Sequence, residues 1–541
     1  MSKLEAPVGI VGAGPVGLIA ALRLADHGVS SVLLEAEPEL LKQGSKACLI
    51  QGDVLEILDQ AGCAQPIDDE GVTWTVARTY VRNKVIRTVE YPHGPGFGPF
   101  VNISQFRIEQ VLAEAVEANP LCELRWGHEV VAVSQDEAAV TVRVSTDAGE
   151  RELRFAYLVA CDGVRSRMRE LMGTEWTGYT HQDRFLITDI KADLPFDKGR
   201  HFHYDPSFNP GRQLVIHPQP NDIWRIDWQL PPDADIEAER ADGRFDQRVR
   251  DVIGDIPYEV DWVSTYRFHQ RVVARLRIGR VLFAGDAAHS LPPYGSRGMN
   301  SGIQDADNLA WKVAFVLAGH ADESLLETYH IERYAAAKEN LRVTEATIRF
   351  MVPPNWIRRW TRSVLLGLSH WLGLARKHVN SGRMAEPYVY TDSPIVQRLP
   401  GDPLMGSFAP DGRVRVDAEP TRLRRLLGTR FVGLCVASDA ASALALMETV
   451  RAGTEEIPVD VVVVLPDGTS ADGLPADATV ARAEEVSLLD SYGAAEGTWW
   501  LVRPDGHLAA RGDRHADFSA ALRAAVGHAS QDRSLVKGTS S

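Results

Sequence analysis

The amino-acid sequence predicts a mixed α/β protein in which a parallel sheet carries an inserted antiparallel sheet and a further α/β domain follows. Three observations support this prediction. The apolar runs Val8–Val11 and Ser31–Leu34 flank a helical pattern, Pro15–His27, in the order of a βαβ unit. Between Phe185 and Leu230, strand-like runs are bounded by Pro, Gly, Asn and Asp, as in an antiparallel sheet. After about residue 400, strand and helix patterns alternate again.

The other elements of the first 400 residues follow from the same signals. Strands are expected where apolar and polar residues alternate or form short apolar runs: Thr73–Tyr91, Thr141–Val144, Arg151–Cys161 and Arg280–Ala284. Helices are expected where apolar residues recur with helical spacing: Ile108–Glu117, Ile303–Ala318, Leu325–Thr344 and Trp356–His378. The last is rich in Trp and Arg, so a membrane-surface or partner helix is the alternative to ordinary packing, which we favour.

A connector rich in Pro and Gly, from Pro394 to Gly412, marks a domain boundary. The elements expected beyond it are the strands Phe431–Val436, Pro458–Leu465, Thr498–Arg503 and His507–Arg511 and the helices Ala440–Arg451, Val486–Tyr492 and Phe518–Val526. A Pro504-Asp505-Gly506 turn makes the last two strands a hairpin. Residues 530–541 are small and polar, which predicts a disordered tail.

Length and composition exclude several classes of protein. The 541 residues allow about three domains. Hydrophobic residues make up 45%, and no apolar run reaches the ~18 residues of a membrane span, so a soluble protein without a membrane partner is expected. The net charge of −15 argues against nucleic acid as a partner. Five scattered cysteines, without a C-x-x-C pair, and a charged start without a signal peptide predict a cytoplasmic protein with no metal site.

The first chemical motif is Gly12-Ala13-Gly14-Pro15-Val16-Gly17, which follows a strand and opens a helix. Gly12 permits a tight turn, Gly14 lets the backbone approach a pyrophosphate, and Gly17 lets the helix pack closely on the strand. Glu35, at the end of the next strand, is placed to accept hydrogen bonds from ribose hydroxyls. These features predict a dinucleotide site, with a purely structural glycine turn as the alternative.

Two further strands run into acidic turns. Leu158–Cys161 leads into Asp162-Gly163, and Val281–Ala284 leads into Gly285-Asp286. If these strands join the βαβ unit in one parallel sheet, their carboxyl ends converge on one crevice, where such sheets bind ligands.

With these motifs, the chain resembles the group A FAD-dependent aromatic hydroxylases, in the branch of phenol hydroxylase and 3-(3-hydroxyphenyl)propionate hydroxylase. The resemblance rests on GAGPVG, CDGVRSRMR, the run from Gly279 to Ala314, and LLETYHIERY. From about Asp402, WWLVRPDGHLAARG resembles the thioredoxin-like appendage of that branch. Without a C-x-x-C pair, this implies a structural or oligomer-forming module, and a homodimer is the assembly that it suggests.

The resemblance implies a Rossmann-like FAD-binding domain, an inserted antiparallel substrate-binding sheet and a C-terminal thioredoxin-like domain. The implied parts are residues 1–180 (first part of the FAD-binding domain, with substrate-sheet strands near 72–100), 181–275 (substrate-binding sheet), 276–395 (second part of the FAD-binding domain and long helices), 400–529 (thioredoxin-like domain) and 530–541 (disordered tail).

Carried over residue by residue, the resemblance implies FAD as cofactor and NAD(P)H as co-substrate. The residues implied in binding FAD are Gly12, Gly14, Pro15, Gly17, Glu35, Ala36, Lys46, Gln105, Arg107, Asp162, Gly163, Arg165, Gly285, Asp286, Pro293, Gly298, Met299 and Asn300. Lys46 stands where many relatives have an arginine, which makes a phosphate contact less forked. Arg165 has a surface ion pair as its alternative. Arg297 is interpreted as a solvated loop residue or as a group that holds an acidic substrate or the flavin pyrimidine.

The implied reaction is hydroxylation of a phenolic ring by O2 through a flavin C4a-hydroperoxide, with Pro292 in the wall beside C4a. A hydrogen-bond acceptor would activate the phenol. The candidate acceptors are Tyr266, His217 and His203, with Tyr204 and His269 as further candidates and packing roles as the alternative. His289 is expected to support the site, not to carry a proton. The rival functions are a flavin epoxidase or Baeyer–Villiger-type oxygenase that tailors a polyketide, and a non-catalytic nucleotide-binding assembly protein.

Overall fold

The computed structural model describes residues 4–40, 47–351, 356–368, 384, 386–399, 401–454, 457–493 and 497–528. The chain divides into two compact units, and the predicted α/β class is confirmed. The first unit comprises Met1–Leu22, Ser31–Ala306 and Ala337–Ala385, and the second comprises Arg23–Ser30, Asp307–Ala336 and Glu386–Ser541. The domain boundaries implied by the resemblance stay predictions.

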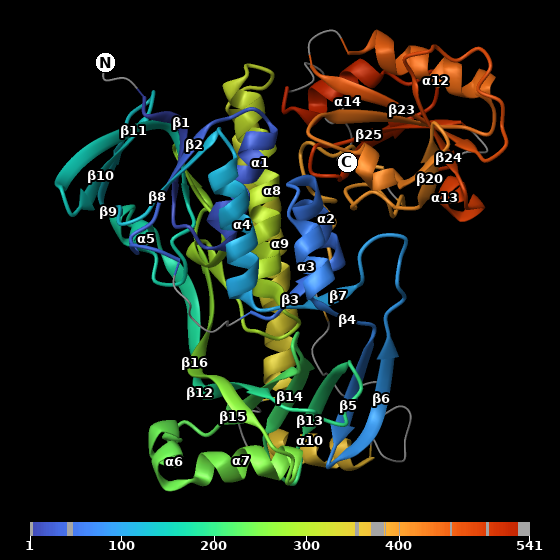
Figure 1. Ribbon diagram of the computed structural model, residues 1–541. Helices are drawn as coiled ribbons and strands as arrows, with labels where there is room; N and C mark the ends of the chain where they lie inside the picture. The colour runs from blue at the N-terminus through green and yellow to red at the C-terminus, as the bar shows by residue number, and fades with distance from the viewer. Residues whose placement is uncertain are drawn as a thin grey trace, which may run out of the picture. The chain divides into compact units, whose positions relative to one another are not determined.

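The predicted parallel sheet lies in the first unit (Figure 1). Its strand order is β17-β18-β11-β1-β2-β8, with β9 and β10 continuing from β11. The bounds are β1 Ala6–Val11, β2 Ser31–Leu34, β8 Cys122–Arg125, β9 Glu129–Gln135, β10 Val140–Thr146, β11 Gly149–Ala160, β17 Arg277–Ile278 and β18 Val281–Phe283. β2 and β18 are buried throughout, as expected of strands inside a parallel sheet. β1 pairs in parallel with β2 and β11, and β11 pairs in parallel with β18, so the three predicted strands end at the same edge.

The inserted sheet has the order β19-β16-β12-β15-β14-β13-β5-β6. Its bounds are β5 Val76–Val81, β6 Lys84–Glu90, β12 Trp176–Lys191, β13 Arg200–Tyr204, β14 Gln213–Pro218, β15 Ile223–Leu230, β16 Glu259–Val273 and β19 His289–Ser290. The strands predicted near 72–100 therefore join this sheet only in part. β4 (Val72–Trp74) and β7 (Phe100–Asn102) instead form a small sheet with β3 (Leu49–Gln51).

The two faces of the inserted sheet differ because side chains alternate along each strand. One face, with Leu214, Trp224, Ile226 and Trp228, packs against the helices α6 (Ile236–Asp242) and α7 (Arg244–Ile253). We call the opposite side the inner face. It carries Phe185, Phe202, Tyr204, Tyr266 and Phe268, and Tyr294 packs in the same cluster.

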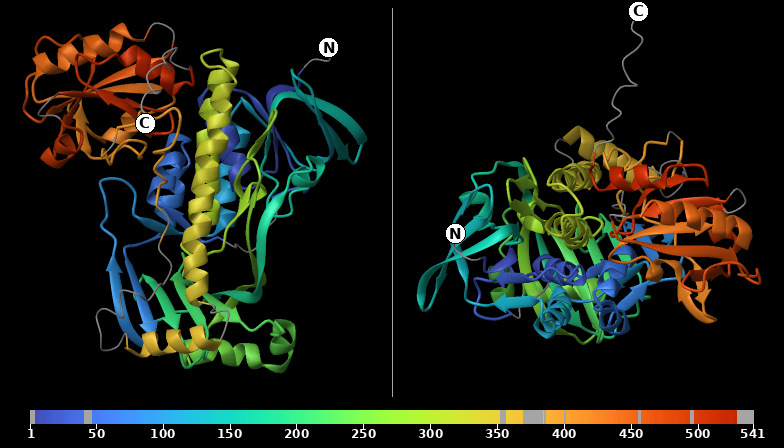
Figure 2. Two further views of the ribbon diagram at one scale, coloured as in Figure 1. Left: turned by 180° about the vertical axis from the view of Figure 1, so that it is seen from behind. Right: turned by 90° about the horizontal axis from the view of Figure 1, so that it is seen from above.

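The remaining helices of the chain up to residue 368 are α1 Pro15–Asp26, α2 Gly52–Gln60, α3 Ala64–Glu70, α4 Gln105–Ala118, α5 Arg167–Leu171, α8 Arg297–Leu317, α9 Ser324–Met351 and α10 Trp356–Leu368. Figure 2 shows α10 beside the inserted sheet, where Leu366 packs in the inner-face cluster. Trp360 of α10 is exposed, so this helix buries one side only. The end of the helix predicted to reach His378 lies outside the described residues.

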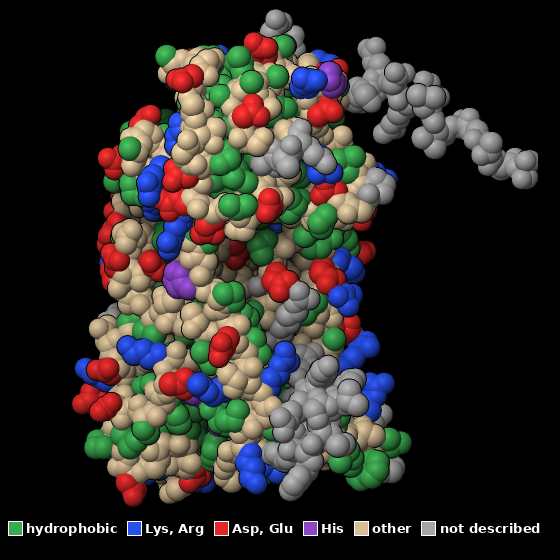
Figure 3. Space-filling model, turned by 90° about the vertical axis from the view of Figure 1, so that its right-hand side faces the viewer, with side chains coloured by type: hydrophobic (Ala, Val, Ile, Leu, Met, Phe, Trp, Pro, Cys, Tyr) green, Lys and Arg blue, Asp and Glu red, His purple; other side chains and the backbone are tan. Residues whose placement is uncertain are grey.

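Among the described residues, no helix is both long and apolar enough to cross a membrane. Basic and acidic side chains are interspersed over the face of the molecule that Figure 3 shows.

The second unit contains a seven-stranded sheet of order β21-β20-β24-β23-β22-β25-β26. Its bounds are β20 Arg413–Val416, β21 Glu419–Arg422, β22 Phe431–Val436, β23 Val459–Pro466, β24 Thr479–Ala483, β25 Thr498–Val502 and β26 Leu508–Gly512, with the helices α12 Ala440–Ala452, α13 Val486–Ser491 and α14 Phe518–Ala525. The predicted central strands, helices and hairpin are present, whereas β20, β21 and β24 were not predicted. The thioredoxin-like label stays a prediction.

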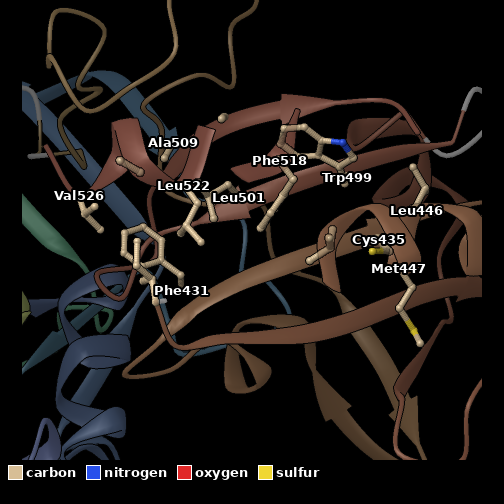
Figure 4. Packing of buried hydrophobic residues seen from close by; sticks show 14 of the residues in the cluster. Phe431, Cys435, Leu446, Met447, Trp499, Leu501, Ala509, Phe518, Leu522 and Val526 are labelled. Atoms are coloured by element: carbon tan, nitrogen blue, oxygen red, sulfur yellow. The ribbon is translucent and has the colours of Figure 1, made fainter. Parts of the chain in front are cut away.

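One face of this sheet carries the main core of the unit. Figure 4 shows Phe431, Leu501, Phe518 and Leu522 pointing toward one another from strands and a helix. Trp311 of α8 and Leu325 of α9 belong to the same core, so parts of both long helices are built into this unit.

Candidate active site

The loop after β1 and the loop after β11 touch where the parallel strands end. Gly12 has φ +99°, and a Cβ there would lie 2.6 Å from the carbonyl oxygen of Cys161. A Cβ at Gly17 would lie 2.0 Å from the carbonyl oxygen of Gly12. Only glycine fits either position, because no real Cβ approaches a backbone oxygen so closely. Gly12 thus has the positive φ of the predicted tight turn, and Gly17 lets α1 pack closely on the loop, as the sequence predicts.

The loop after β18 meets the same place from the other side. A Cβ at Gly285, where φ is +59°, would lie 2.9 Å from Cγ2 of Val16 in α1. A Cβ at Gly302 of α8 would lie 2.6 Å from the same atom and 3.1 Å from Cα of Gly285. The three motifs, which are distant in sequence, thus come together at the carboxyl ends of β1, β11 and β18.

Arg169 of α5 holds two of these loops together. It is 7% exposed and its guanidinium donates to the carbonyl oxygens of Gly163 (3.2 Å), Asp286 (3.2 Å) and Ala287 (3.1 Å). It also lies 3.9 Å above the ring centre of Trp176. No role was predicted for Arg169, although it is the last residue of the motif CDGVRSRMR.

Asp305 of α8 fixes the loop after β18. Its Oδ2 accepts a hydrogen bond from the Gly285 N–H (3.0 Å) and lies 2.7 Å from Nε2 of His289. Asp305 and His289 are both fully buried. His289 therefore supports the loop, in keeping with the role expected of it.

Two of the predicted cofactor-binding glycines have open space beside them. Apart from the glycine itself, its chain neighbours and its own helix backbone, no atom of the described residues lies within 4 Å of a Cβ built at Gly14 or at Gly298. The Asp162 carboxyl accepts from the Met168 N–H (2.8 Å) through Oδ2, while its buried Oδ1 has no hydrogen-bond partner among the described residues. Burial raises the pKa of Asp162. Glu35 accepts from the Ala13 N–H (2.7 Å), which places a carboxylate beside the glycine loop. A glycine loop at the start of a helix, with two carboxylates beside it, fits FAD.

The other predicted FAD residues divide by exposure. Those at least partly exposed around the strand ends are Gly14, Pro15, Glu35, Ala36, Asp162, Gly163, Asp286, Pro293 and Gly298, whereas Gly12, Gly17, Gly285, Met299 and Asn300 are buried. Asn300 donates to the carbonyl oxygen of Leu49 (3.0 Å) and accepts from the Gln51 N–H (3.0 Å). Its side chain therefore joins α8 to β3, and a contact of Asn300 with a cofactor would come from its backbone.

Two of the predicted FAD-binding residues, Arg107 and Gln105, form hydrogen bonds with neighbouring carboxylates. Arg107 donates to Glu70 through Nε (2.7 Å) and Nη2 (2.7 Å), and this pair lowers the pKa of Glu70. Gln105 donates to Glu109 (2.8 Å). Arg165 is exposed. Lys46 lies outside the described residues.

Arg297 is not the solvated loop residue that one interpretation expected. It is 4% exposed, pairs with Asn340 and donates to the carbonyl oxygen of Met384 (3.2 Å). The preceding Ser296 has φ +53°, so the chain enters α8 through a left-handed residue that turns Arg297 inward.

The inner face of the inserted sheet carries an ion pair and a second acid that the sequence analysis missed. Arg225 is 1% exposed and is held by Asp189 of β12 through two hydrogen bonds, Nε to Oδ1 at 2.8 Å and Nη2 to Oδ2 at 2.7 Å. Asp227 follows two residues later on the same face of β15. The signal was the segment IWRIDWQL, where two charged residues alternate with large apolar ones.

The predicted acceptors do not converge. His217 and Tyr266 lie on the inner face with Tyr204, because His217 pairs with Arg225 across the strands and Tyr266 packs on the inner-face cluster. His203 lies on the opposite side, where it stacks on Tyr80 at 4.2 Å and where burial lowers its pKa to about 3. His269 lies three residues after Tyr266 in β16, so its side chain is on the opposite face, where Nδ1 lies 2.9 Å from the Thr180 hydroxyl. Their placement argues against His203 and His269 as substrate contacts.

The inner face meets the loop that leads from the FAD motif into α8. Gln213 of β14 donates to the hydroxyl of Tyr294 (3.0 Å), and Tyr294 packs against Phe185 and Phe268. The neighbouring Pro292 is buried and Pro293 exposed. The loop of Pro292 and Pro293 thus lies between the strand-end crevice and the inner face.

Comparisons with known proteins agree with this geometry. The model of a family described as FAD binding domain matches residues 5–344. A 3-(3-hydroxy-phenyl)propionate/3-hydroxycinnamic acid hydroxylase of Comamonas testosteroni is 30% identical over 378 residues, which are 68% of this chain but only 62% of that enzyme. A para-nitrophenol 4-monooxygenase of Pseudomonas sp. (strain WBC-3) is 30% identical over 343 residues, or 62% of this chain and 83% of that enzyme. The crystal structure of aklavinone-11 hydroxylase in a ternary complex with FAD and aklavinone matches with a TM-score of 0.73 at 25% identity, covering 97% of this chain and 99% of that one.

Proposed function

Because the chain belongs to the FAD binding domain family, we propose that it is an FAD-dependent, NAD(P)H-consuming monooxygenase that hydroxylates a phenolic or related aromatic compound. The observation that carries this proposal is the meeting of the Gly12, Asp162 and Gly285 loops within the matched residues. The similar proteins named above are a hydroxylase or monooxygenase in each case, which supports oxygen transfer as the reaction.

We assign the parts of FAD to the residues that the geometry leaves accessible. The backbone at Gly14 would receive the pyrophosphate, since its Cβ space is open. Glu35 would hold the adenosine ribose, and the exposed Asp286 would hold the ribityl chain. The start of α8 at Gly298 and Met299 would face the flavin pyrimidine, where the helix N-terminus favours negative charge.

Bound FAD, reduced by NAD(P)H, would supply the electrons that activate O2 for transfer of one oxygen atom to the ring. The chain's own residues would orient the ring and exclude water. Pro292 and Tyr294 stand between the crevice and the inner face, where they would form a wall of the reaction site. His217 and Tyr266 would contact the substrate from the sheet. A homodimer and a cytoplasmic location, which the sequence predicts, belong to the same proposal.

The test begins with the cofactor. We expect purified protein to release FAD on denaturation, and Asp286→Ala to lose most of it because the ribityl hydroxyls lose their acceptor. The matched control is Asp147→Ala, which changes an exposed residue in the turn between β10 and β11 and should leave the FAD content unchanged. Full flavin content in Asp286→Ala would remove the ribityl role assigned to Asp286.

The second step tests the reaction. A panel of phenols should accelerate NAD(P)H oxidation, with hydroxylated product formed in proportion to NAD(P)H consumed. NAD(P)H oxidation at a constant rate that no phenol changes, with peroxide as the sole product, would contradict aromatic hydroxylation.

A further inference from the structure

Four buried polar atoms on the inner face have no hydrogen-bond partner among the described residues. They are Gln213 Oε1, His217 Nδ1, Arg225 Nη1 and Asp227 Oδ1. Folded proteins pair at least about 90% of their buried polar groups, so each exception needs an explanation. Gln213, His217 and Arg225 are at most 7% exposed, and Asp227 is half-buried with its Oδ1 atom buried.

These atoms belong to neighbouring positions on two paired strands. Arg225 lies directly across from His217, and Asp227 lies directly across from Val215, with Gln213 two residues further along β14. Opposite residues of an antiparallel pair have Cβ atoms about 5 Å apart. Unpaired hydrogen-bond donors and acceptors therefore lie close together in one small area of the inner face.

The charges around Asp227 single it out as the acceptor. Asp189 of β12 already neutralises Arg225 through two hydrogen bonds, which leaves Asp227 as the carboxyl with an open oxygen. Asp227 also interacts electrostatically with Arg200 of β13, Tyr266 of β16 and Cys48, which precedes β3. Burial raises the pKa of Asp227 to about 7, Asp189 acts in the same direction, and Arg225 and Arg200 oppose them.

We propose that Asp227 accepts the proton of the substrate's ring hydroxyl and that the Asp189–Arg225 pair positions it. This inference rests on the proposed function and names the part of the substrate that faces β15. The phenolic O–H bond breaks, the proton forms a new O–H bond at Asp227 Oδ1, and the electron pair stays on the phenolate oxygen. Arg225 Nη1 donates to that oxygen, and the proton returns to the product's oxygen after the ring has been hydroxylated.

The geometry also restricts the substrate. A carboxylate placed against this part of β15 would face ionised Asp227, while the charge of Arg225 is already matched by Asp189. The polar group that fits is therefore a neutral hydroxyl that can give up a proton, and an acidic substituent must point elsewhere. The proposal therefore favours a phenol that is bound by its hydroxyl.

The first experiment compares Asp227→Asn with wild type as FAD-loaded enzymes, using any phenol that wild type hydroxylates. Asp261→Asn, the same change at an exposed position of β16, is the matched control. For wild type we expect kcat/KM to rise with pH through about 7, because Asp227 must be ionised to accept a proton. Asp227→Asn should lose about 100-fold or more in kcat/KM, and its remaining rate should follow the ionisation of the phenol itself.

The second experiment needs no substrate. The folded-state pKa of Asp227, about 7, lies above its ordinary value of 3.8, so the folded protein binds more protons between these values and loses stability as the pH rises through this window. Asparagine carries no such charge. The Tm of Asp227→Asn should therefore equal that of wild type near pH 4 and exceed it near pH 8, while Asp261→Asn should follow wild type at both.

The outcomes separate this inference from the proposed function. If Asp227→Asn keeps the rate and the pH profile of wild type, or lowers Tm equally at both pH values, Asp227 is not the acceptor. If wild type binds FAD but hydroxylates no phenol, the proposed function itself fails. Loss of rate together with the pH-dependent gain in Tm supports both.

Discussion

Gly14 and Gly17 belong to one loop, yet the space around them differs. A methyl group at Gly14 would meet no atom within 4 Å among the described residues beyond the local backbone, whereas at Gly17 it would lie 2.0 Å from the Gly12 carbonyl oxygen. We therefore predict that the first glycine serves ligand binding and the second serves the fold.

This difference gives a prediction at the scale of single residues. Gly14→Ala should leave the flavin-free protein within about 0.5 kcal/mol of wild type in its free energy of unfolding, but weaken FAD binding about tenfold or more because the methyl group occupies the open cradle. Gly17→Ala should lower the free energy of unfolding by about 1–3 kcal/mol. Denaturant unfolding of flavin-free protein and titration with FAD measure the two effects. Equal destabilisation by both changes would contradict the separation.

Single residues also show how far the sequence could predict the site. The glycines and Asp162 follow predicted strands, and the common direction of parallel strands brings them together. Arg225 and Asp227 were visible as charges in an apolar strand, but no spacing says which face of a sheet meets a ligand. His203 and His217 looked alike for the same reason, and the pairing of their strands places them on opposite faces.

Among the elements, the short helix α5 connects two loops through Arg169. Its guanidinium donates to four carbonyl groups, those of Gly163, Val164, Asp286 and Ala287. Hydrogen bonds from a charged group contribute about 1.5–3 kcal/mol each. Arg169 therefore links the loops after β11 and β18 directly.

Arg169→Ala should lower the free energy of unfolding by about 3 kcal/mol and reduce the FAD that the purified protein retains, since both loops carry cofactor contacts. Arg167→Ala changes the same helix at an exposed residue that pairs only with Glu170 at the surface, and it should alter neither quantity measurably. Normal flavin content in a destabilised Arg169→Ala protein would show that the loop spacing is held by other contacts.

The central elements were predictable because their apolar runs are long, whereas the missed strands β20, β21 and β24 are short and rich in Arg and Thr. Arg413–Val416 does alternate charged and apolar residues, but four residues are too few to separate a strand from a loop. Their pairing comes from neighbouring strands of the sheet, which a single segment does not reveal.

At the scale of the whole molecule, the second unit is built around buried charges. Glu332 of α9 receives hydrogen bonds from Lys312 of α8 at 2.6 Å and from Arg503 at 2.6 and 2.9 Å, and Arg503 also pairs with Asp505. Lys312, Glu332 and Arg503 have no exposed side-chain surface. Arg503, which lies beyond the residues that the family model matches, therefore neutralises Glu332, which lies within them.

Arg503→Met should lower the free energy of unfolding by about 3–5 kcal/mol, because Glu332 would keep only part of its compensation. The double variant Glu332→Gln/Arg503→Met removes the acid as well and should recover part of the loss. Thermal and denaturant unfolding measure both. No recovery in the double variant would mean that Arg503 acts through packing on Trp311 or Tyr390, whose rings it faces at 5.4 and 5.2 Å.

The inclusion of Asp307–Ala336 in the second unit has a consequence for engineering by recombination. A crossover placed at the proline-rich connector would transfer residues 386–541 without the helical segments that complete their core. Trp311 and Glu332 would not be transferred with them. A folded chimera with a relative would require residues 23–30, 307–336 and 386–541 to be exchanged together. The boundaries suited to recombination therefore fall inside the long helices α8 and α9.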